Sequence, residues 1–232
     1  MCCALLAAVA TAQDKSDESD LSLGIQGGVG YMTTTGAMSD TFGGGASFTG
    51  GLTADYKRLR LKADFAYCQP NLKNHNIFNI KDSEGRDAQI NSDANATQTM
   101  LGVQLGFKVF QNKRFSVTPA AGLFFTHYGW SLQDIEWDKD DKGEEFFKVK
   151  DLKPYKFNNA SWMASIDIDI KLGEKKTLEP FFLNNRYSRL STYLRITPWV
   201  AGARFNKIDP AVKGLYTGVT VRATGFMQSL GF

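Results

Sequence analysis

A run of acidic residues is the first feature of this chain that could carry chemistry: Asp138, Asp140, Asp141, Glu144 and Glu145. Within it, Asp138-Lys-Asp-Asp-Lys-Gly143 follows the start of a calcium-binding loop, with glycine in the sixth place. The twelfth place is Val149, where such a loop needs a bidentate glutamate, and the two interspersed lysines would oppose a cation. The pattern favours a solvated acidic loop, so we predict no metal site and no cofactor.

A histidine near a serine is the second feature. His127 precedes Ser131 in the segment His127-Tyr-Gly-Trp-Ser131, and a hydrolase would place a histidine beside a serine nucleophile and an acid. Four residues of extended strand span roughly 13 Å, which is too far for a hydrogen bond within the strand. The neighbouring Tyr128 and Trp130 favour a histidine in an aromatic belt, and we predict no catalytic residues.

Charged residues at alternate positions form the third feature. The segment 58–67 reads R-L-R-L-K-A-D-F-A-Y, so that apolar side chains occupy one face of a strand and charged side chains the other. The same alternation returns near residues 101–109, 162–171 and 215–222. The charges that share the polar face are Arg60, Lys62, Asp64, Lys108, Asp167, Asp169 and Arg222. We predict that they form an ion-paired network.

Eight segments show the alternation or apolar content of strands. They are Leu21–Met32, Phe42–Tyr56, Leu59–Gln69, Thr97–Phe110, Phe115–Trp130, Ser161–Leu172, a stretch within Thr177–Ser188, and Leu215–Phe226. The seventh is the least regular, and Thr192–Val200 competes for its place. Pro198 argues against that alternative as a central strand, because proline cannot donate a ladder hydrogen bond.

The connections between these strands alternate strictly between short and long. The short ones are Asp55–Arg58, Gln111–Arg114 and Gly173–Lys176; the long ones are Thr33–Thr41, Pro70–Ala96, Ser131–Ala160 and Arg189–Gly214. Short turns at one rim and long loops at the other are typical of barrels in the bacterial outer membrane. The predicted fold is therefore all-β: a closed, antiparallel, up-and-down transmembrane β-barrel of eight strands.

The composition of the two faces supports this orientation. Glycine and other small residues accompany the charges, as expected for a narrow lumen that side chains fill. Aromatic residues bracket the apolar face at both ends, as at membrane interfaces: Tyr31, Tyr67, Tyr128, Trp130 and Trp162 toward the long loops, and Tyr56, Phe110 and Phe115 toward the short turns. We expect outer-membrane lipid to surround the apolar face.

Length and composition exclude several other classes. No stretch of the 232 residues approaches 18 consecutive apolar residues, so there is no transmembrane helix. A net charge of +3 with interleaved signs predicts no nucleic-acid binding. Residues 1–13 resemble the end of a secretory signal peptide whose charged start lies upstream. We expect 14–20 to be a polar linker and 21–232 the barrel. Cleavage would leave Cys68 as the last thiol, which excludes an internal disulfide.

The signal-like start, the hairpin rhythm and the terminal Phe232 together resemble the small outer-membrane β-barrel proteins of bacteria, including the PorT-like and OmpA-transmembrane-domain-like barrels. The resemblance implies a location in the bacterial outer membrane and a barrel-assembly machinery that reads Phe232. Phe226 and Phe232 are at even positions and Val219 and Val221 at odd positions, so in a regular strand the two pairs would lie on opposite faces. A bulge near Gly225 would be needed to bring all four to lipid.

The resemblance favours a non-enzymatic protein whose long loops carry a structural, adhesion or interaction role, with an unidentified loop partner. One alternative is a lipid A-modifying enzyme on the same scaffold that depends on His127. The other is a secreted soluble barrel of lipocalin type, which would invert the faces and bury Leu59, Leu61 and Phe65.

Overall fold

The computed structural model describes residues 21–40, 42–71, 78–81, 85, 87–90, 95–131, 133–139, 142–143, 145–151, 155–178, 187–203 and 214–229. The predicted signal peptide, the predicted linker and Phe232 lie outside these residues, as do Asp140, Asp141 and Glu144 of the acidic run. Among the described residues, no helix is long and apolar enough to cross a membrane.

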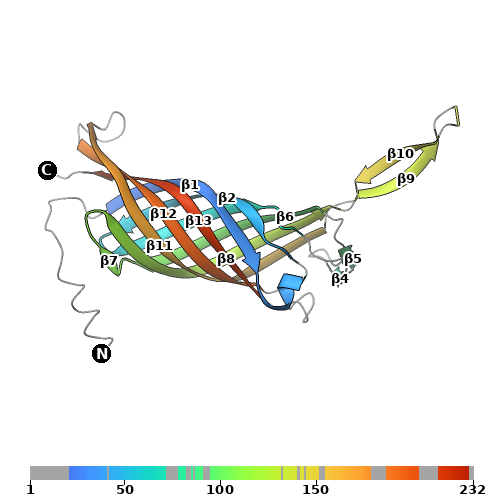
Figure 1. Cartoon of the computed structure of the whole chain (residues 1–232), viewed down its shortest axis with the longest axis horizontal. Coiled ribbons are helices and arrows are strands. Elements are labelled where there is room, and N and C mark those ends of the chain that lie inside the picture. The colour runs from blue at the N-terminus through green and yellow to red at the C-terminus, as the bar shows by residue number, and fades with distance from the viewer. Residues whose placement is uncertain are drawn as a thin grey trace.

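Eight long strands form a closed antiparallel barrel (Figure 1). They are β1 (Leu21–Thr34), β2 (Gly45–Tyr56), β3 (Leu59–Cys68), β6 (Asn95–Phe107), β8 (Phe115–Ser131), β11 (Tyr155–Leu178), β12 (Tyr187–Ala203) and β13 (Gly214–Ser229). Each pairs with its neighbours along the chain, and the β1–β13 pairing closes the cylinder. A two-residue strand, β7 (Phe110–Gln111), pairs with β8. The prediction of an eight-stranded closed barrel is confirmed.

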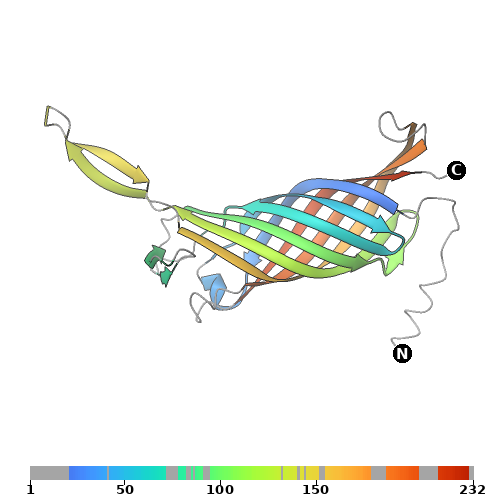
Figure 2. The same ribbon diagram turned by 180° about the vertical axis from the view of Figure 1, so that it is seen from behind.

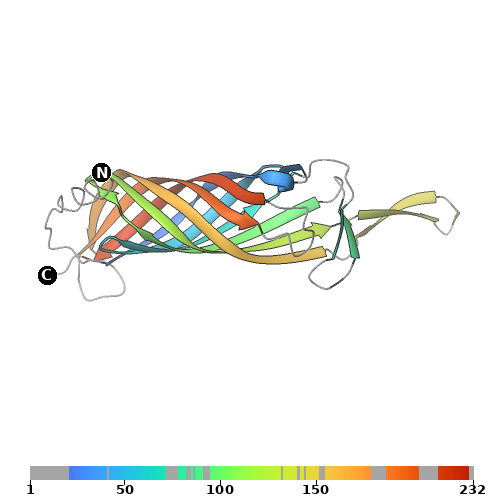
Figure 3. The same cartoon turned by 90° about the horizontal axis from the view of Figure 1, so that it is seen from below.

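The two ends of the barrel differ (Figure 2). At the turn end, Lys57 joins β2 to β3 with φ 53°, and the Asn112 side chain accepts hydrogen bonds from the backbone N–H groups of Arg114 and Phe115 before β8. The loop end carries the 3₁₀ helix η2 (Gly36–Asp40) and two separate hairpins. These are β4 (Phe78–Lys81) with β5 (Asp87–Ile90), and β9 (Gln133–Lys139) with β10 (Glu145–Asp151). The β9–β10 hairpin extends well beyond the barrel (Figure 3).

The predicted position of the seventh strand is wrong. β12 spans Tyr187–Ala203 and includes Pro198 in its interior, whereas the predicted stretch begins in the last residues of β11 and continues into undescribed residues. The predicted turn Gly173–Lys176 is also wrong, because β11 continues through it to Leu178 with a register shift between Lys171 and Gly173. A bulge accommodates the glycine and the charged residues without ending the strand, and a closed barrel holds Pro198 between two neighbours despite its missing N–H.

The orientation of the faces agrees with a membrane barrel. Leu61 is 53% exposed and Lys62 is 1% exposed, and the other apolar residues of the outward face, such as Leu23, Phe48 and Leu105, are likewise exposed. A soluble barrel of lipocalin type would bury Leu61 and expose Lys62. That alternative is therefore wrong, since an exposed apolar belt is stable only in a non-aqueous surrounding.

Two aromatic residues lie inside although the sequence analysis placed Tyr128 on the outward face and expected a bulge to turn Phe226 toward lipid. β13 pairs regularly with β1 and β12 through Gly225, without a bulge, so Phe226 points inward and is buried. Tyr128 and Phe42 are buried in the interior as well. Tyr128 occupies an even, inward position of β8, while Phe42 precedes β2 and is carried inward by the β1–β2 connection.

Candidate functional site

The barrel interior contains a polar half at the turn end and an apolar half at the loop end. The polar half includes all seven charged residues predicted from the sequence: Arg60, Lys62, Asp64, Lys108, Asp167, Asp169 and Arg222. The structure adds two charged residues to them, Asp55 and Arg195. The nine residues form a connected set of ion pairs.

Arg60 lies at the centre of this network. Its Nε is 2.8 Å from Oδ1 of Asp55, and its Nη1 is 2.8 Å from Asp169 Oδ2 and 3.3 Å from Asp167 Oδ2. Lys108 extends the network toward the short turns, with its Nζ 2.9 Å from Asp55 Oδ2. Arg60 thus links β2, β3 and β11 across the lumen.

Lys62 is the next inward residue of β3 after Arg60, on the side of the loop end. Its Nζ donates to Asp167 Oδ1 and to Ser165 Oγ, each at 2.8 Å, and lies 3.8 Å from Asp64 Oδ2. Asp167 also accepts a hydrogen bond from Thr197 Oγ1 at 3.0 Å. The fully buried Lys62 and Asp167 are therefore matched by several polar partners, as buried charges require.

Arg195 on β12 was missed by the sequence analysis because that strand was misplaced. Its Nε donates to Asp169 Oδ1 at 2.6 Å, and its Nη1 donates to Gln26 Oε1 at 2.7 Å. Gln26 in turn donates to Asp64 Oδ1 at 2.5 Å, and Arg222 Nη1 lies 2.7 Å from the same oxygen. The alternation of residues 191–201 could have identified Arg195 if proline had not been taken to exclude a strand there.

Phe226 fills the space between two of these arginines. Its ring centroid lies 5.6 Å from Arg60 Cζ and 5.5 Å from Arg195 Cζ, a geometry suited to cation–π attraction. Tyr193 meets the ring edge-on at 5.5 Å. Gly24 makes room for the ring, since a Cβ at that position would lie 2.8 Å from two ring carbons. The inward Phe226 is thus part of the network.

Every strand of the barrel contributes to the polar half. Gln26 comes from β1, Gln104 from β6 and Ser116 from β8, and they bond to Arg195, Ser165 and Asp169. Five cationic side chains face four carboxylates in the described network. Because the network spans the lumen from every side, it occludes the barrel at this level.

The loop-end half is filled by apolar side chains, which the sequence analysis did not predict. The buried members are Met32, Met38, Phe42, Cys68, Ala96, Met100, Phe124, Tyr128, Met163, Trp199, Ala201 and Tyr216. Tyr216 donates a 3.0 Å hydrogen bond to the hydroxyl oxygen of Tyr128, and Phe124 packs against both Trp199 and Tyr216. Methionines at inward positions of β1, β6 and β11 were the available sequence signal.

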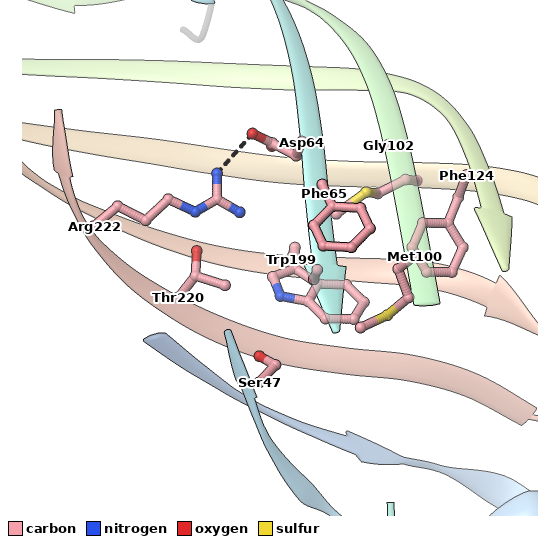
Figure 4. Close-up of a pocket in the computed structure, with 11 residues that line it drawn as sticks. Ser47, Asp64, Phe65, Met100, Gly102, Phe124, Trp199, Thr220 and Arg222 are labelled. Carbon is pink, nitrogen blue, oxygen red and sulfur yellow. Dashed lines mark hydrogen bonds and ion pairs between the residues drawn. The ribbon is translucent and has the colours of Figure 1, made fainter. Parts of the chain in front are cut away.

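A small cavity of about 20 Å³ lies where the two halves meet (Figure 4). Met100, Phe124 and Trp199 line its apolar side, and the Asp64–Arg222 ion pair its polar side. This volume is close to that of a single water site. The cavity marks the boundary between two differently filled compartments.

His127 lies on the outward face, away from this site. Its Nδ1 is 2.6 Å from Oδ1 of Asn158 on the adjacent strand β11. The side chain of Ser131 is outside the described part of the structure. Within the described ranges, no group of three or more histidine, cysteine or acidic residues is arranged to hold a metal ion.

A closed barrel with an apolar outer belt, a filled lumen and short turns opposite long loops defines an integral protein of the bacterial outer membrane. The family described as outer membrane protein beta-barrel domain matches residues 1–177. The chain belongs to this family and is located in the bacterial outer membrane. The finer resemblance to PorT-like and OmpA-like barrels stays a prediction.

The solved structures to which this chain is similar include the following three. Neisserial surface protein A is 8% identical, with a TM-score of 0.45, covering 89% of this chain and 96% of that one. Ail, the attachment invasion locus protein of Yersinia pestis, is 9% identical, with a TM-score of 0.43 and coverage of 88% and 97%. OprG from Pseudomonas aeruginosa is 10% identical, with a TM-score of 0.39 and coverage of 91% and 97%. A comparison with curated proteins found no match.

Proposed function

We propose that this protein is a non-enzymatic outer-membrane barrel that does not conduct, and that its loop-end segments carry an interaction role at the cell surface. The observation that carries the first part is the ion-pair network, which joins side chains from all eight strands across the lumen. An open aqueous channel needs a wider barrel of about 16 strands.

Both halves of the interior support closure. Opening the polar half to ion flow would separate charges such as Lys62 and Asp167, which lie 2.8 Å apart without contact to bulk water. Opening the apolar half would expose buried residues such as Phe124 and Met100 to water, which is unfavourable. The barrel is therefore a rigid support, and a surface function belongs to the segments outside it.

The β9–β10 hairpin is the most extended of these segments (Figure 1). Its strands pair in continuous register from Gln133↔Asp151 to Lys139↔Glu145, as a two-stranded sheet separate from the barrel. A hairpin of this kind presents unpaired backbone groups along both edges, which are available for contact with another molecule. This supports an interaction role for residues 133–151.

Two measurements test the proposal. Purified full-length protein in planar bilayers is expected to give no stable single-channel current, and a steady open conductance would overturn the closed-barrel part. A variant in which a short Gly-Ser linker replaces residues 133–151 is expected to show the same heat-dependent gel mobility but reduced adherence and aggregation of the cells that carry it. Unchanged adherence and aggregation would overturn the role given to the hairpin.

A further inference from the structure

Two neighbouring segments at the turn end of the barrel each present a lysine followed by an arginine. Lys57 and Arg58 lie between β2 and β3, and Lys113 and Arg114 lie just before β8. Arg58 is half-buried and the other three are exposed. The backbone N–H of Lys108 donates to the Arg58 carbonyl at 2.8 Å, so the two turns are neighbours on the rim (Figure 2). These four cationic side chains are called the basic patch below.

No acidic side chain at the surface of the two turns offsets the basic patch. Within residues 55–59 and 107–115, all of which the structure describes, the one acidic residue is Asp55. It is buried and ion-paired with cations of the lumen. Three of the four patch cations have other interactions within the protein. Interactions between exposed charges are weak, so a bound anion can share these cations, and the patch favours an anionic partner.

The basic patch borders the apolar outer belt. Tyr56, Leu59 and Phe110 are exposed beside it, and the ring centroids of Phe110 and Phe115 are 5.8 Å apart. Lys57 Nζ lies 5.4 Å from the centroid of the Tyr56 ring. Aromatic and basic side chains at the edge of an apolar belt mark the depth of lipid headgroups, because the ring or stem stays near the acyl chains while the charge reaches the phosphate.

Backbone bonds hold both turns in shape. Asn112 Oδ1 accepts hydrogen bonds from the N–H groups of Arg114 at 2.8 Å and Phe115 at 2.7 Å. The carbonyl groups of Arg58 and Arg114 each accept a backbone bond at 2.8 Å from a neighbouring segment. These bonds do not involve the charged ends of the patch residues. The cations can therefore be replaced without removing the bonds that shape the turns.

We infer that the basic patch binds the phosphate of anionic phospholipids in the leaflet around the turn end, in preference to zwitterionic phospholipids. A headgroup with a net negative charge is attracted to clustered lysines and arginines, and its acyl chains would lie along exposed residues such as Leu59. The short turns of such barrels face the periplasm, so the lipid is that of the periplasmic leaflet. The inference goes beyond the proposed function, and its test reads neither conductance nor adherence.

The test uses a bimane fluorophore on Leu59→Cys, where β3 begins beside both turns. The protein is full-length, its native cysteines are replaced by alanine, and it is refolded into phosphatidylcholine vesicles. The vesicles contain an equal small fraction of either dibrominated phosphatidylglycerol or dibrominated phosphatidylcholine, which quench the fluorophore. The matched control carries the fluorophore on Tyr31→Cys, exposed near the loop end. Quenching by the anionic lipid is expected to be about twofold to fivefold stronger at position 59 and equal to that by phosphatidylcholine at position 31.

Two charge variants test whether the basic patch causes this preference. The first combines Lys57→Gln, Arg58→Gln, Lys113→Gln and Arg114→Gln, and it is expected to abolish the excess quenching at position 59. The second removes the same charge elsewhere in the chain, with Lys81→Gln, Arg86→Gln, Lys153→Gln and Lys156→Gln, and it is expected to leave the excess unchanged. Heat-dependent gel mobility checks that both variants fold.

Salt provides a measurement that needs no change to the patch. With the patch intact, about 0.5 M NaCl is expected to remove most of the excess quenching, because exposed charges are screened. An equal preference for the anionic lipid at positions 59 and 31 would overturn the inference. So would an excess that survives the four patch substitutions in folded protein, or one that high salt does not reduce.

Discussion

Removal of one carboxylate charge from the polar half is the most direct test of the network. Asp167→Asn keeps the size of the side chain and one acceptor oxygen, but leaves five cations facing three carboxylates. Lys62 bears most of this loss, because Asp167 is its partner at 2.8 Å and its other carboxylate, Asp64, is 3.8 Å away. Arg60 is affected less, since it keeps Asp55 and Asp169, each at 2.8 Å.

The expected destabilisation is about 3–5 kcal/mol, the usual effect of leaving a buried charge without its partner. The measurement is urea unfolding of protein refolded into lipid vesicles, followed by heat-dependent gel mobility and tryptophan fluorescence, with linear extrapolation to zero denaturant. The matched control is Glu174→Gln. Glu174 pairs with Lys171 and Arg189 at a partly exposed position of β11, so its loss is expected to change stability by at most about 1 kcal/mol.

A double variant tests whether the effect comes from the pair. Lys62→Met combined with Asp167→Leu removes both charges. The double variant is expected to lose less stability than the sum of the losses of the two single variants. The coupling should be large, because the two charged atoms lie within hydrogen-bond distance and both side chains are buried. If Asp167→Asn unfolds at the same urea concentration as Glu174→Gln, the network does not hold the barrel together and the reasoning is refuted.

Three further predictions concern other parts of the barrel. Gly24→Ala should destabilise by about 1–3 kcal/mol, because its Cβ would overlap the Phe226 ring, whereas Gly27→Ala, with open space around it, should have a smaller effect in the same urea assay; equal effects would contradict the packing. A fluorophore on Leu61→Cys should be quenched by brominated acyl chains and one on Lys62→Cys should not; the reverse would invert the two faces. His127→Ala should leave the mass spectrum of lipid A in producing cells identical to that of cells with the unaltered protein, since no catalytic role is proposed for the His127–Asn158 pair; a changed lipid A would show that His127 takes part in an enzymatic reaction.

Much of the barrel was predictable from local pattern. Alternation in segments such as 58–67 determined which side chains face lipid, because successive residues of a strand point to opposite sides. It also placed Arg60, Lys62, Asp64 and four further charges on the inward face, where the structure has them. These features depend on nearest neighbours in the chain and need no knowledge of the fold.

Tertiary structure alone decided the remaining features. Pro198 and Gly173 normally argue against strand interiors, yet a closed barrel holds both within strands because neighbours on each side fix the backbone. Phe226 lies inside because β13 keeps its register through Gly225, and Arg60 on β3 and Arg195 on β12 form its site. Phe42 and Met38 turn inward because the loop end of the lumen offers an apolar surface that would otherwise face water. Which charges pair, and which compartment stays apolar, follow from contacts across the lumen, and four of the ion pairs join residues more than a hundred positions apart. Alternation along one strand does not contain that information.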